Sequence, residues 1–383
     1  MTMTINNEHK KLNVPNLRFK EFQGEWEKCI LGDYGKVVTG NTPPTKDIEN
    51  YENGTYLWAS PADLSTIKLI SETKTKLSSK GFSKTRALPK GSVLVTCIGS
   101  TIGKTGMATK EMSTNQQINS IVVNDNNDNE FVYYAIQSAF PRYLSSIAVQ
   151  AVPIISKSAF EMLPNKRPCL QEQKKIGKFL SLLDERIATQ NKIIDKLQSL
   201  IKGISGRIFA SIQGIEYRMS DIASITNGDS NVQDAVTESN DGLYPFFDRS
   251  EDIKYLSTFL FDKEAIIYPG EGAEFIPRYF KGKFALHQRC YAIFDFNEII
   301  DAQYLYFYLK TQNSYFVRNA VGSTVPSLRL DTFQKLKVVV PPKKIQYSVS
   351  LCLSSMEQKF NIENDILQML LKQKQYLLRQ MFI

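Results

Sequence analysis

The chain has 383 residues, enough for two or three domains of ordinary size. Its composition, 42% apolar and 22% charged, is typical of a folded globular protein and excludes wholesale disorder. The net charge of +8 favours a polyanionic partner, because neutralising phosphate groups requires lysine and arginine.

Cysteine and histidine are few, which limits the chemistry available to the chain. The five cysteines are dispersed without a C-x-x-C spacing, a pattern typical of free thiols in a reducing compartment. Only two histidines occur, His9 and His287, so a histidine-rich metal site is excluded. No apolar run approaches a membrane span, and the polar start of the chain has no signal-peptide core. We therefore expect a cytoplasmic protein without a membrane partner, whose residues 1–15 form a flexible N-terminal tail.

Two globular segments, 16–167 and 214–340, mix short β-like runs with helical stretches. The predicted strands are rich in β-branched residues and are bounded by Gly, Asn and Ser. They cover 92–99 and 118–124 in the first segment, and 264–270 and 290–296 in the second. Helices are predicted at 130–146 and 301–317. This pattern predicts a mixed α/β fold, with a β-rich core in each of two domains.

A long segment with a heptad pattern follows each domain, at 168–213 and at 341–383. Each begins at a proline, which the start of a helix tolerates. Apolar residues alternate between two seam positions, as a coiled coil requires. In the first segment the seam comprises Ile176, Leu180, Leu183, Ile187, Ile194, Leu197, Ile201, Ile204 and Ile208. In the second it comprises Val349, Leu353, Met356, Phe360, Leu367, Leu370, Leu377 and Met381.

The order of domain and helix occurs twice, and the residue offsets indicate a tandem duplication. A shift of 173 residues aligns the two helical segments and places Leu180 on Leu353. The beginnings of the two domains match at a shift of 188 instead, which places Gly40 on Gly228. The difference of 15 residues predicts a longer first domain, because loops accept insertions at little thermodynamic cost.

We expect the two long helices to pair with each other, because neither can bury its whole seam against its own domain. The pairing must be antiparallel, since a whole domain separates the helices. Polar residues at seam positions, Gln190, Glu363 and Lys374, can fix register and partner choice. Gly203 and Gly206 each cost about 1 kcal/mol in a helix interior and predict a bend or fraying there. The residues predicted to form the pairing are Ile176, Leu180, Leu183, Ile187, Ile194, Leu197, Ile201, Leu353, Met356, Phe360, Leu367 and Leu370.

Basic residues gather at comparable places in the two domains. Residues 64–110 hold nine lysines and arginines against one acid, Glu72. Residues 276–289 hold four basic residues and no acid, with Tyr279 and Phe280 between them. A solvated basic face would have the same composition, but its occurrence in both repeats favours contact with phosphates and bases of double-stranded DNA.

The candidate DNA-binding residues are the basic and amide side chains of these stretches and of the loops beside them. In the first domain they are Lys74, Lys76, Lys84, Arg86, Lys104, Asn115 and Gln116. In the second they are Arg249, Arg278, His287, Gln288, Arg289 and Arg329.

The motifs of catalysis are missing or incomplete. The segment GSTIGKTG, at 99–106, resembles a phosphate-binding loop but has three residues where the motif has four. A cofactor fingerprint of the G-x-G-x-x-G type and a His–Cys metal cluster are both lacking. We therefore interpret the chain as a non-catalytic recognition protein. Two alternatives remain open: a nucleotide-dependent DNA enzyme that uses the loop at 99–106, and a coiled-coil adaptor whose basic faces meet only protein.

Four segments together resemble the specificity (S) subunit family of type I restriction–modification systems, along nearly the whole chain. They are VPNLRFKEFQGEWEKCILGDYG (14–35), GNTPPTKDIENYENGTYLWASPADLS (40–65), KGSVLVTCIGSTIGKTGMATKEMSTNQQINSIVV (90–123) and PCLQEQKKIGKFLSLLDERI (168–187). The second copy departs from the pattern, with PPKKIQYSVSLCLSSME where the family has "EQ", and FFDRSEDI where the first copy has WASPADLS.

The resemblance implies two target recognition domains joined by two long helices that pair antiparallel. It also implies two methyltransferase (modification) subunits on those helices, and restriction subunits that join for cleavage. S-adenosylmethionine would belong to the modification subunits, and ATP and magnesium to the motor–nuclease subunits, with no cofactor on this chain. Antiparallel helices would put the domains at opposite ends of a spacer, so that each enters the major groove of its own half-site, about 34 Å apart. Because the domains differ in sequence, the expected target is bipartite and asymmetric, with an unread gap.

Overall fold

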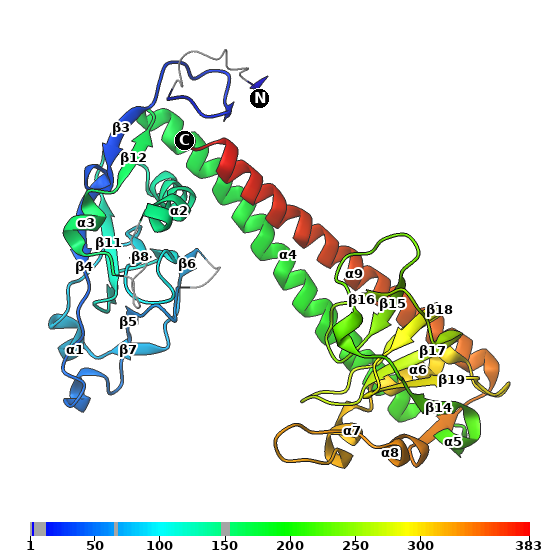
Figure 1. Cartoon of the computed structure of the whole chain (residues 1–383). Helices are drawn as coiled ribbons and strands as arrows, with labels where there is room; N and C mark the ends of the chain where they lie inside the picture. Colours follow the sequence, from blue (N-terminus) through cyan, green and yellow to red (C-terminus); the bar gives the residue numbers. More distant parts are fainter. Residues whose placement is uncertain (1, 4–12, 65–67, 147–153) are drawn as a thin grey trace. The chain divides into compact units, whose positions relative to one another are not determined.

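The computed structural model describes residues 2–3, 13–64, 68–146 and 154–383, and most of the predicted tail at 1–15 lies outside them (Figure 1). The chain forms two compact units. The first contains Met1–Asn191 and Ile366–Ile383, and the second contains Lys192–Asp365. The division falls inside both long helices, so each unit consists of one globular part and one portion of each helix.

The first unit is built on a five-stranded sheet, and a smaller three-stranded sheet lies in the same unit. The larger has the order β4 (Gly35–Thr39), β11 (Ile118–Val123), β8 (Val93–Thr96), β9 (Thr105–Ala108), β6 (Leu69–Ile70). The smaller has the order β10 (Ser113–Thr114), β5 (Tyr56–Ala59), β7 (Thr75–Leu77). Two further ribbons pair β1 (Thr2–Met3) with β2 (Leu17–Arg18), and β3 (Glu27–Ile30) with β12 (Pro164–Arg167). The helices are α1 (Ser79–Ser83), α2 (Asn129–Ser146) and α3 (Lys157–Glu161).

The second unit has a single six-stranded sheet in place of the two larger sheets. Its order is β14 (Ser224–Asn227), β19 (Cys290–Phe294), β17 (Phe261–Pro269), β18 (Arg278–Leu286), β15 (Tyr244–Phe247), β16 (Lys254–Leu256). A ribbon pairs β13 (Ile215–Arg218) with β20 (Lys337–Val340). The helices are α5 (Met219–Ile222), α6 (Ala302–Lys310), α7 (Asn313–Asn319) and α8 (Leu330–Gln334).

The strand registers reproduce the duplication. In the first unit Glu27 of β3 pairs with Arg167 of β12, and in the second Ile215 of β13 pairs with Val340 of β20. The shift of 188 relates Glu27 to Ile215, and the shift of 173 relates Arg167 to Val340. The 15-residue difference therefore lies inside the globular part, between two strands that close it in the same way.

The predicted fold class, mixed α/β domains with long helices, is confirmed. The four predicted strands correspond to β8, β11, β17 and β19, and the first predicted helix to α2. The helix predicted at 301–317 is instead two helices, α6 and α7. It is interrupted because the N–H groups of Thr311 and Gln312 bond three residues back, to Tyr308 and Leu309, which tightens the last turn and stops the α-helical ladder.

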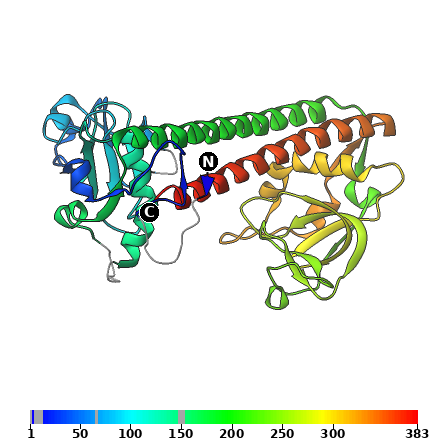
Figure 2. The same ribbon diagram turned by 90° about the horizontal axis from the view of Figure 1, so that it is seen from above.

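The two long helices are α4 (Leu170–Ser211) and α9 (Lys343–Gln380), which lie side by side in each unit (Figures 1 and 2). α4 continues through Gly203 and Gly206 to its end at Ser211. In the first unit, Ile176 and Leu180 of α4 share a core with Leu377 of α9. In the second, Ile204 and Ile208 of α4 pack against the core that contains Val349 and Leu353 of α9. Higher numbers on one helix meet lower numbers on the other, so the pairing is antiparallel in each unit.

The residues predicted to form the helix pairing all lie away from open solvent. Five of them are buried: Ile176, Leu180, Ile194, Leu353 and Leu370. The other seven are half-buried: Leu183, Ile187, Leu197, Ile201, Met356, Phe360 and Leu367. Large apolar residues on other faces of the same helices, such as Leu182 and Leu351, are exposed. The heptad pattern therefore identifies the buried stripe and separates it from the rest of each helix.

A tyrosine–carboxylate–lysine anchor ties the helices to the globular part of each unit. In the first unit Asp184 of α4 accepts a hydrogen bond from Tyr134 of α2 at 2.6 Å and pairs with Lys374 of α9 at 2.6 Å. Lys374, which interrupts the apolar seam of α9, therefore has its charge paired with that of Asp184. In the second unit Glu357, 173 residues after Asp184, accepts from Tyr306 at 3.0 Å and pairs with Lys310.

The seam can be tested with a pair of substitutions on α9. Leu353→Ala is expected to lower the free energy of unfolding by about 2–5 kcal/mol, because it leaves a cavity in a core where Leu353 is 1% exposed. Leu351→Ala, two residues away on the same helix and 57% exposed, should change it by less than about 0.5 kcal/mol. Urea unfolding followed by circular dichroism measures both. Equal losses for the two variants would contradict the assignment of the seam.

Candidate nucleic-acid interface

A three-residue turn of the same construction precedes the second strand in the order of the larger sheet of each unit. The first-unit turn is Asn115–Gln117, before β11, and the second-unit turn is His287–Arg289, before β19. In the first, Gln117 N–H donates to Asn115 Oδ1 at 3.1 Å. In the second, Arg289 N–H donates to His287 Nδ1 at 3.2 Å. The two turns are therefore equivalent, although different side chains supply the acceptor.

Neighbouring strands fix both turns through matching backbone hydrogen bonds. Asn115 N–H donates to the carbonyl of Ala59 at the end of β5, and His287 N–H donates to that of Phe247 at the end of β15, both at 2.9 Å. Ala59 and Phe247 are related by the shift of 188 that aligns the domain beginnings. Each turn is thus held by the end of the equivalent strand.

Two glycines let another loop approach each turn closely. A Cβ on Gly40, after β4, would clash with the carbonyl oxygen of Asn115. A Cβ on Gly228, after β14, would clash with the carbonyl oxygens of Leu286 and His287. No residue other than glycine fits at either place without moving the turn. These glycines explain why the pattern Gly40–Gly228 survives in both copies.

In the first unit, three predicted DNA-binding residues gather around the loop that follows β4. Arg86 Nη1 donates to the carbonyl of Thr39 at 2.7 Å, and the carbonyl of Lys84 accepts from Asn41 Nδ2 at 2.9 Å. Gln116 is exposed and accepts a hydrogen bond from Thr42 Oγ1 of the same loop. Arg86 and Gln116 therefore lie exposed beside this loop, whereas the ammonium of the exposed Lys84 is paired with Asp47 at 3.0 Å.

The other first-unit candidates occupy different positions. Asn115 is buried and bonded within its turn, so its side chain shapes the turn. Lys74 and Lys76 lie at β7, where Lys76 pairs with Glu72 at 2.7 Å. Lys104 is exposed in the turn between β8 and β9. A contact of any of these residues with DNA stays a prediction.

The glycine-rich segment at 99–106 is a connection between two strands. Gly99 and Gly103 both adopt positive φ, near 90°, and the chain continues into β9. A phosphate-binding loop instead leads into a helix whose N-terminal N–H groups hold the phosphates. This segment supplies no such helix.

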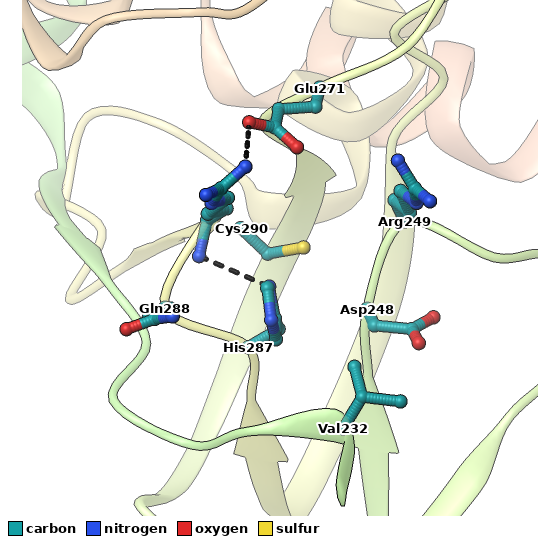
Figure 3. Close-up of a pocket in the computed structure, with 8 residues that line it drawn as sticks. Val232, Asp248, Arg249, Glu271, His287, Gln288 and Cys290 are labelled. Atoms are coloured by element: carbon teal, nitrogen blue, oxygen red, sulfur yellow. Dashed lines mark hydrogen bonds and ion pairs between the residues drawn. The ribbon is translucent and has the colours of Figure 1, made fainter.

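In the second unit, the turn borders a cavity of about 280 Å³ (Figure 3). Loops after β14, β15 and β17 close it together with the turn itself. Its lining residues are Val232, Asp248, Arg249, Glu271, His287, Gln288, Arg289 and Cys290. Four of these, Arg249, His287, Gln288 and Arg289, are predicted DNA-binding residues that the fold brings together.

Carboxylates fix two sides of this cavity. Asp248 accepts from Lys254 Nζ at 2.6 Å and from Ser250 N–H at 2.8 Å. Burial would raise the pKa of Asp248, but these hydrogen bonds outweigh it and hold the pKa below its ordinary value. Glu271 pairs with Arg289 Nη1 at 2.6 Å. The lining therefore carries ionised carboxylates as well as cations.

His287 is uncharged at neutral pH. Burial lowers its pKa below the ordinary 6.5, and the positive charges of Arg289 and Arg249 act in the same direction against the opposing charge of Asp248. Because Nδ1 accepts the Arg289 N–H, the proton of the neutral ring is on Nε2. His287 thus offers a hydrogen-bond donor without a charge.

Arg278 and Arg329 lie beside the cavity. Arg278 of β18 donates through Nη2 to the carbonyl of Ser250, and no acceptor in the described part of the chain reaches its buried Nη1. Arg329 is exposed, and the preceding N–H of Leu328 donates to the carbonyl of Gly270 at 2.8 Å. Neither lines the cavity, and their contacts with DNA stay predictions.

Sequence reasoning missed the two acids of the cavity, Asp248 and Glu271, because only cations and amides were sought. It also missed the equivalence of Asn115 and His287. These residues are 172 apart, one fewer than the helical offset, and the shared glutamine in TNQQI and LHQRC was the available signal.

Among the residues that the structure describes, no three His, Cys, Asp or Glu side chains are grouped so that they could hold a metal ion. In the same part of the chain, no helix combines the length and the apolarity that crossing a membrane requires. All five cysteines are free thiols, as predicted.

Comparison with known proteins assigns the family. The profile of the type I restriction modification DNA specificity domain matches the chain twice, at residues 23–199 and 215–372. The chain belongs to this family. The two matches correspond to the two copies of the duplication, and each contains one of the equivalent turns.

Individual relatives agree with this assignment. The chain is 30% identical over 182 residues to the MjaIX specificity subunit of Methanocaldococcus jannaschii, which covers 45% of this chain and 42% of that protein. It is 29% identical over 187 residues to the HindI specificity subunit of Haemophilus influenzae, a match that covers 46% of this chain and 40% of that protein. The chain thus spans about two fifths of the length of these curated relatives. The crystal structure of the type I restriction–modification S subunit from M. genitalium shares the fold, with a TM-score of 0.67, 18% identity and coverage of 97% of this chain and 99% of that one.

The state of His287 leads to a prediction about pH. Because its pKa is lower in the folded chain, the stability contributed by the neutral ring is complete above pH 6.5 and is lost as the pH falls below that value. His287→Asn should remove this dependence and keep the turn, since Asn115 supplies the same acceptor in the first unit. NMR titration of the His287 ring, whose resonance is the one missing from the spectrum of the variant, should give a pKa below 6.5. Urea unfolding at pH 7.5 and 5.5 should show a larger loss for the wild type than for the variant. A pKa at or above 6.5 would contradict this description of the turn.

Proposed function

We propose that the chain is the DNA-recognition subunit of a type I restriction–modification complex, in which each unit reads one half of a bipartite target. The observation that carries the proposal is the repeated turn inside two matches to the DNA specificity domain. Each turn presents a glutamine to solvent, Gln116 or Gln288. A glutamine amide can bond both N6 and N7 of adenine in the major groove.

Differences between the units favour an asymmetric target. The first unit surrounds its turn with Lys84, Arg86 and the loop after β4. The second unit borders its turn with a cavity that contains two carboxylates, Asp248 and Glu271. Side chains of such different charge recognise different base edges. The two half-sites should therefore differ in sequence, with an unread gap between them.

The proposal gives the chain no catalytic role and places it in the cytoplasm, where its DNA would be found. Catalysis would reside on two modification subunits, which carry S-adenosylmethionine, and on restriction subunits, which carry ATP and magnesium. The description of the family as a specificity domain supports this division. The alternative of a nucleotide-dependent enzyme loses support, because the segment at 99–106 leads into a strand.

Modified-base mapping tests the proposal directly. DNA from cells that carry this chain together with its modification subunit should be methylated at one bipartite, asymmetric motif. Affinity of the assembled complex for that motif should fall steeply as salt rises, because phosphate contacts release counterions. A coiled-coil adaptor that meets only protein would give neither the motif nor the salt dependence. ATP binding by the isolated chain would instead support the enzyme alternative.

Substitution of the two exposed glutamines tests whether each unit reads one half-site. Gln116→Ala should relax base preference in one half of the motif only, and Gln288→Ala in the other half only. Each loss should be about 1–3 kcal/mol of discrimination at one base pair, the value of a bidentate base contact. Both side chains are exposed, and the hydrogen bond that Gln116 accepts from Thr42 lies at the surface, so neither change should alter the free energy of unfolding by more than about 0.5 kcal/mol. If both variants affected the same half-site, the assignment of one unit to each half would be wrong.

A further inference from the structure

The two equivalent turns differ most at their third residue. In the first unit this residue is Gln117, whose Oε1 accepts from Asn115 Nδ2 at 3.0 Å, so its side chain is bonded back to the turn. In the second unit it is Arg289, whose side chain is 63% exposed. The same backbone thus carries a side chain turned inward in one copy and a long cation directed to solvent in the other.

Glu271 holds the guanidinium of Arg289. Arg289 Nη1 donates to Glu271 Oε1 at 2.6 Å, and the Glu271 side chain is only 17% exposed. Gly270 lies so close to the turn that a Cβ there would clash with the carbonyl oxygen of Arg289. On the other side, the backbone of Glu271 forms an isolated antiparallel β-bridge with that of Ser327. The acid is therefore fixed by backbone contacts on two sides, and it fixes one edge of the guanidinium.

An ion pair this exposed adds little to stability, because water screens the cation. Its physical effect is orientation. The guanidinium has five N–H donors, of which one is engaged with Glu271. A guanidinium held at one edge can offer a pair of parallel donors at another, which is what a bidentate acceptor requires.

The charges of the cavity distinguish between a phosphate and a base as the acceptor. Asp248 and Glu271 both line it, and the pKa of Asp248 lies below its ordinary value, so this carboxyl is ionised. These two carboxylates balance the charges of Arg249 and Arg289, so the lining has no excess of positive charge to attract a phosphate. The neutral edge of a base requires no such excess. Among base edges in the major groove, only guanine offers two acceptors side by side, O6 and N7.

Resting on the proposed function of the second unit, we infer that Arg289 reads a guanine in one half-site and that Glu271 positions its guanidinium for that contact. Arg289 is a specificity-determining residue, and Glu271 is a positioning residue that acts through it. The first unit has Gln117 at this place and lacks a guanine contact from it. This difference at the third turn residue accounts for two half-sites of unequal sequence, although the two turns share one backbone construction.

The inference can be tested with the complex of this chain and its modification subunit. The motif from base mapping should contain a G·C pair in the half-site that responds to Gln288→Ala. Arg289→Lys keeps a positive charge but loses the paired donors, so discrimination for guanine at that pair should fall by about 5- to 150-fold. Arg289→Gln should shift the preference toward adenine. Glu271→Gln, which keeps Arg289 itself, should weaken discrimination at the same pair. The other half-site should not change in any of these variants.

Lys335→Gln is the matched control, because it removes one exposed cation from the same unit outside the cavity. It should leave the preference at every base unchanged. A uniform loss of affinity for all sequences in Arg289→Lys would identify a phosphate contact and overturn the inference. A motif without a G·C pair in that half-site would overturn it while leaving the proposed function intact. A wild-type complex without any bipartite motif would overturn both.

Discussion

Burial of one apolar seam on each long helix is the constraint on which both units depend. Helices of 42 and 38 residues gain little stability from intrinsic propensity, so an apolar stripe of this length must be covered by another element. Each helix covers the other, and both contribute to the globular cores. The first core is completed by Phe382 from the end of the chain, whose ring lies 5.5 Å from that of Phe131 and 6.1 Å from that of Trp26. This core therefore combines residues of the first globular part with residues of the second copy, such as Leu377 and Phe382.

The charged anchors give this apolar frame a defined orientation. Asp184 and Glu357 occupy the same place in the two copies, and each meets a tyrosine and a lysine. The lysine comes from α9 in the first unit, as Lys374, and from α6 in the second, as Lys310. Removing one member would leave a partly buried charge without its partner, which costs more than the intact pair contributes. The anchor thus restricts how a helix can rotate on its domain, while the seam buries apolar surface.

Features that depend on periodicity along the chain could be predicted from the sequence. The heptads of α4 and α9 and the strands β8, β11, β17 and β19 follow from local spacing alone. The break at Thr311 could not be predicted in this way, because the apolar residues of α6 and α7 continue one pattern across it. It lies where the N–H groups of Thr311 and Gln312 bond three residues back, and neither residue is a proline or a glycine.

The candidate site was predictable only in part, for a related reason. Gln116, His287, Gln288 and Arg289 were identified by residue type, whereas Asp248 and Glu271 join them only when separate loops meet. A DNA-binding surface is expected to be rich in cations, but an acid beside an arginine can fix the direction of its guanidinium. Equivalence of the two turns was also hidden, because Asn115 and His287 share no chemical class. They share one capacity, a side-chain acceptor placed to receive the N–H two residues on.

That shared capacity explains how a duplicated scaffold can diverge in recognition without losing its fold. The acceptor of each turn, its backbone bonds to β5 or β15 and the glycine packed against it are all internal to the unit. They leave the side chain of the second turn residue exposed in both units, whereas that of the third is bonded back to Asn115 in the first unit and exposed in the second. Substitution at these places changes the groups offered to a ligand at little cost in stability. The second turn residue is glutamine in both copies, Gln116 and Gln288. The third differs between the copies, with Gln117 in the first and Arg289 in the second. Recognition can therefore change one side chain at a time while the turn that carries it stays the same.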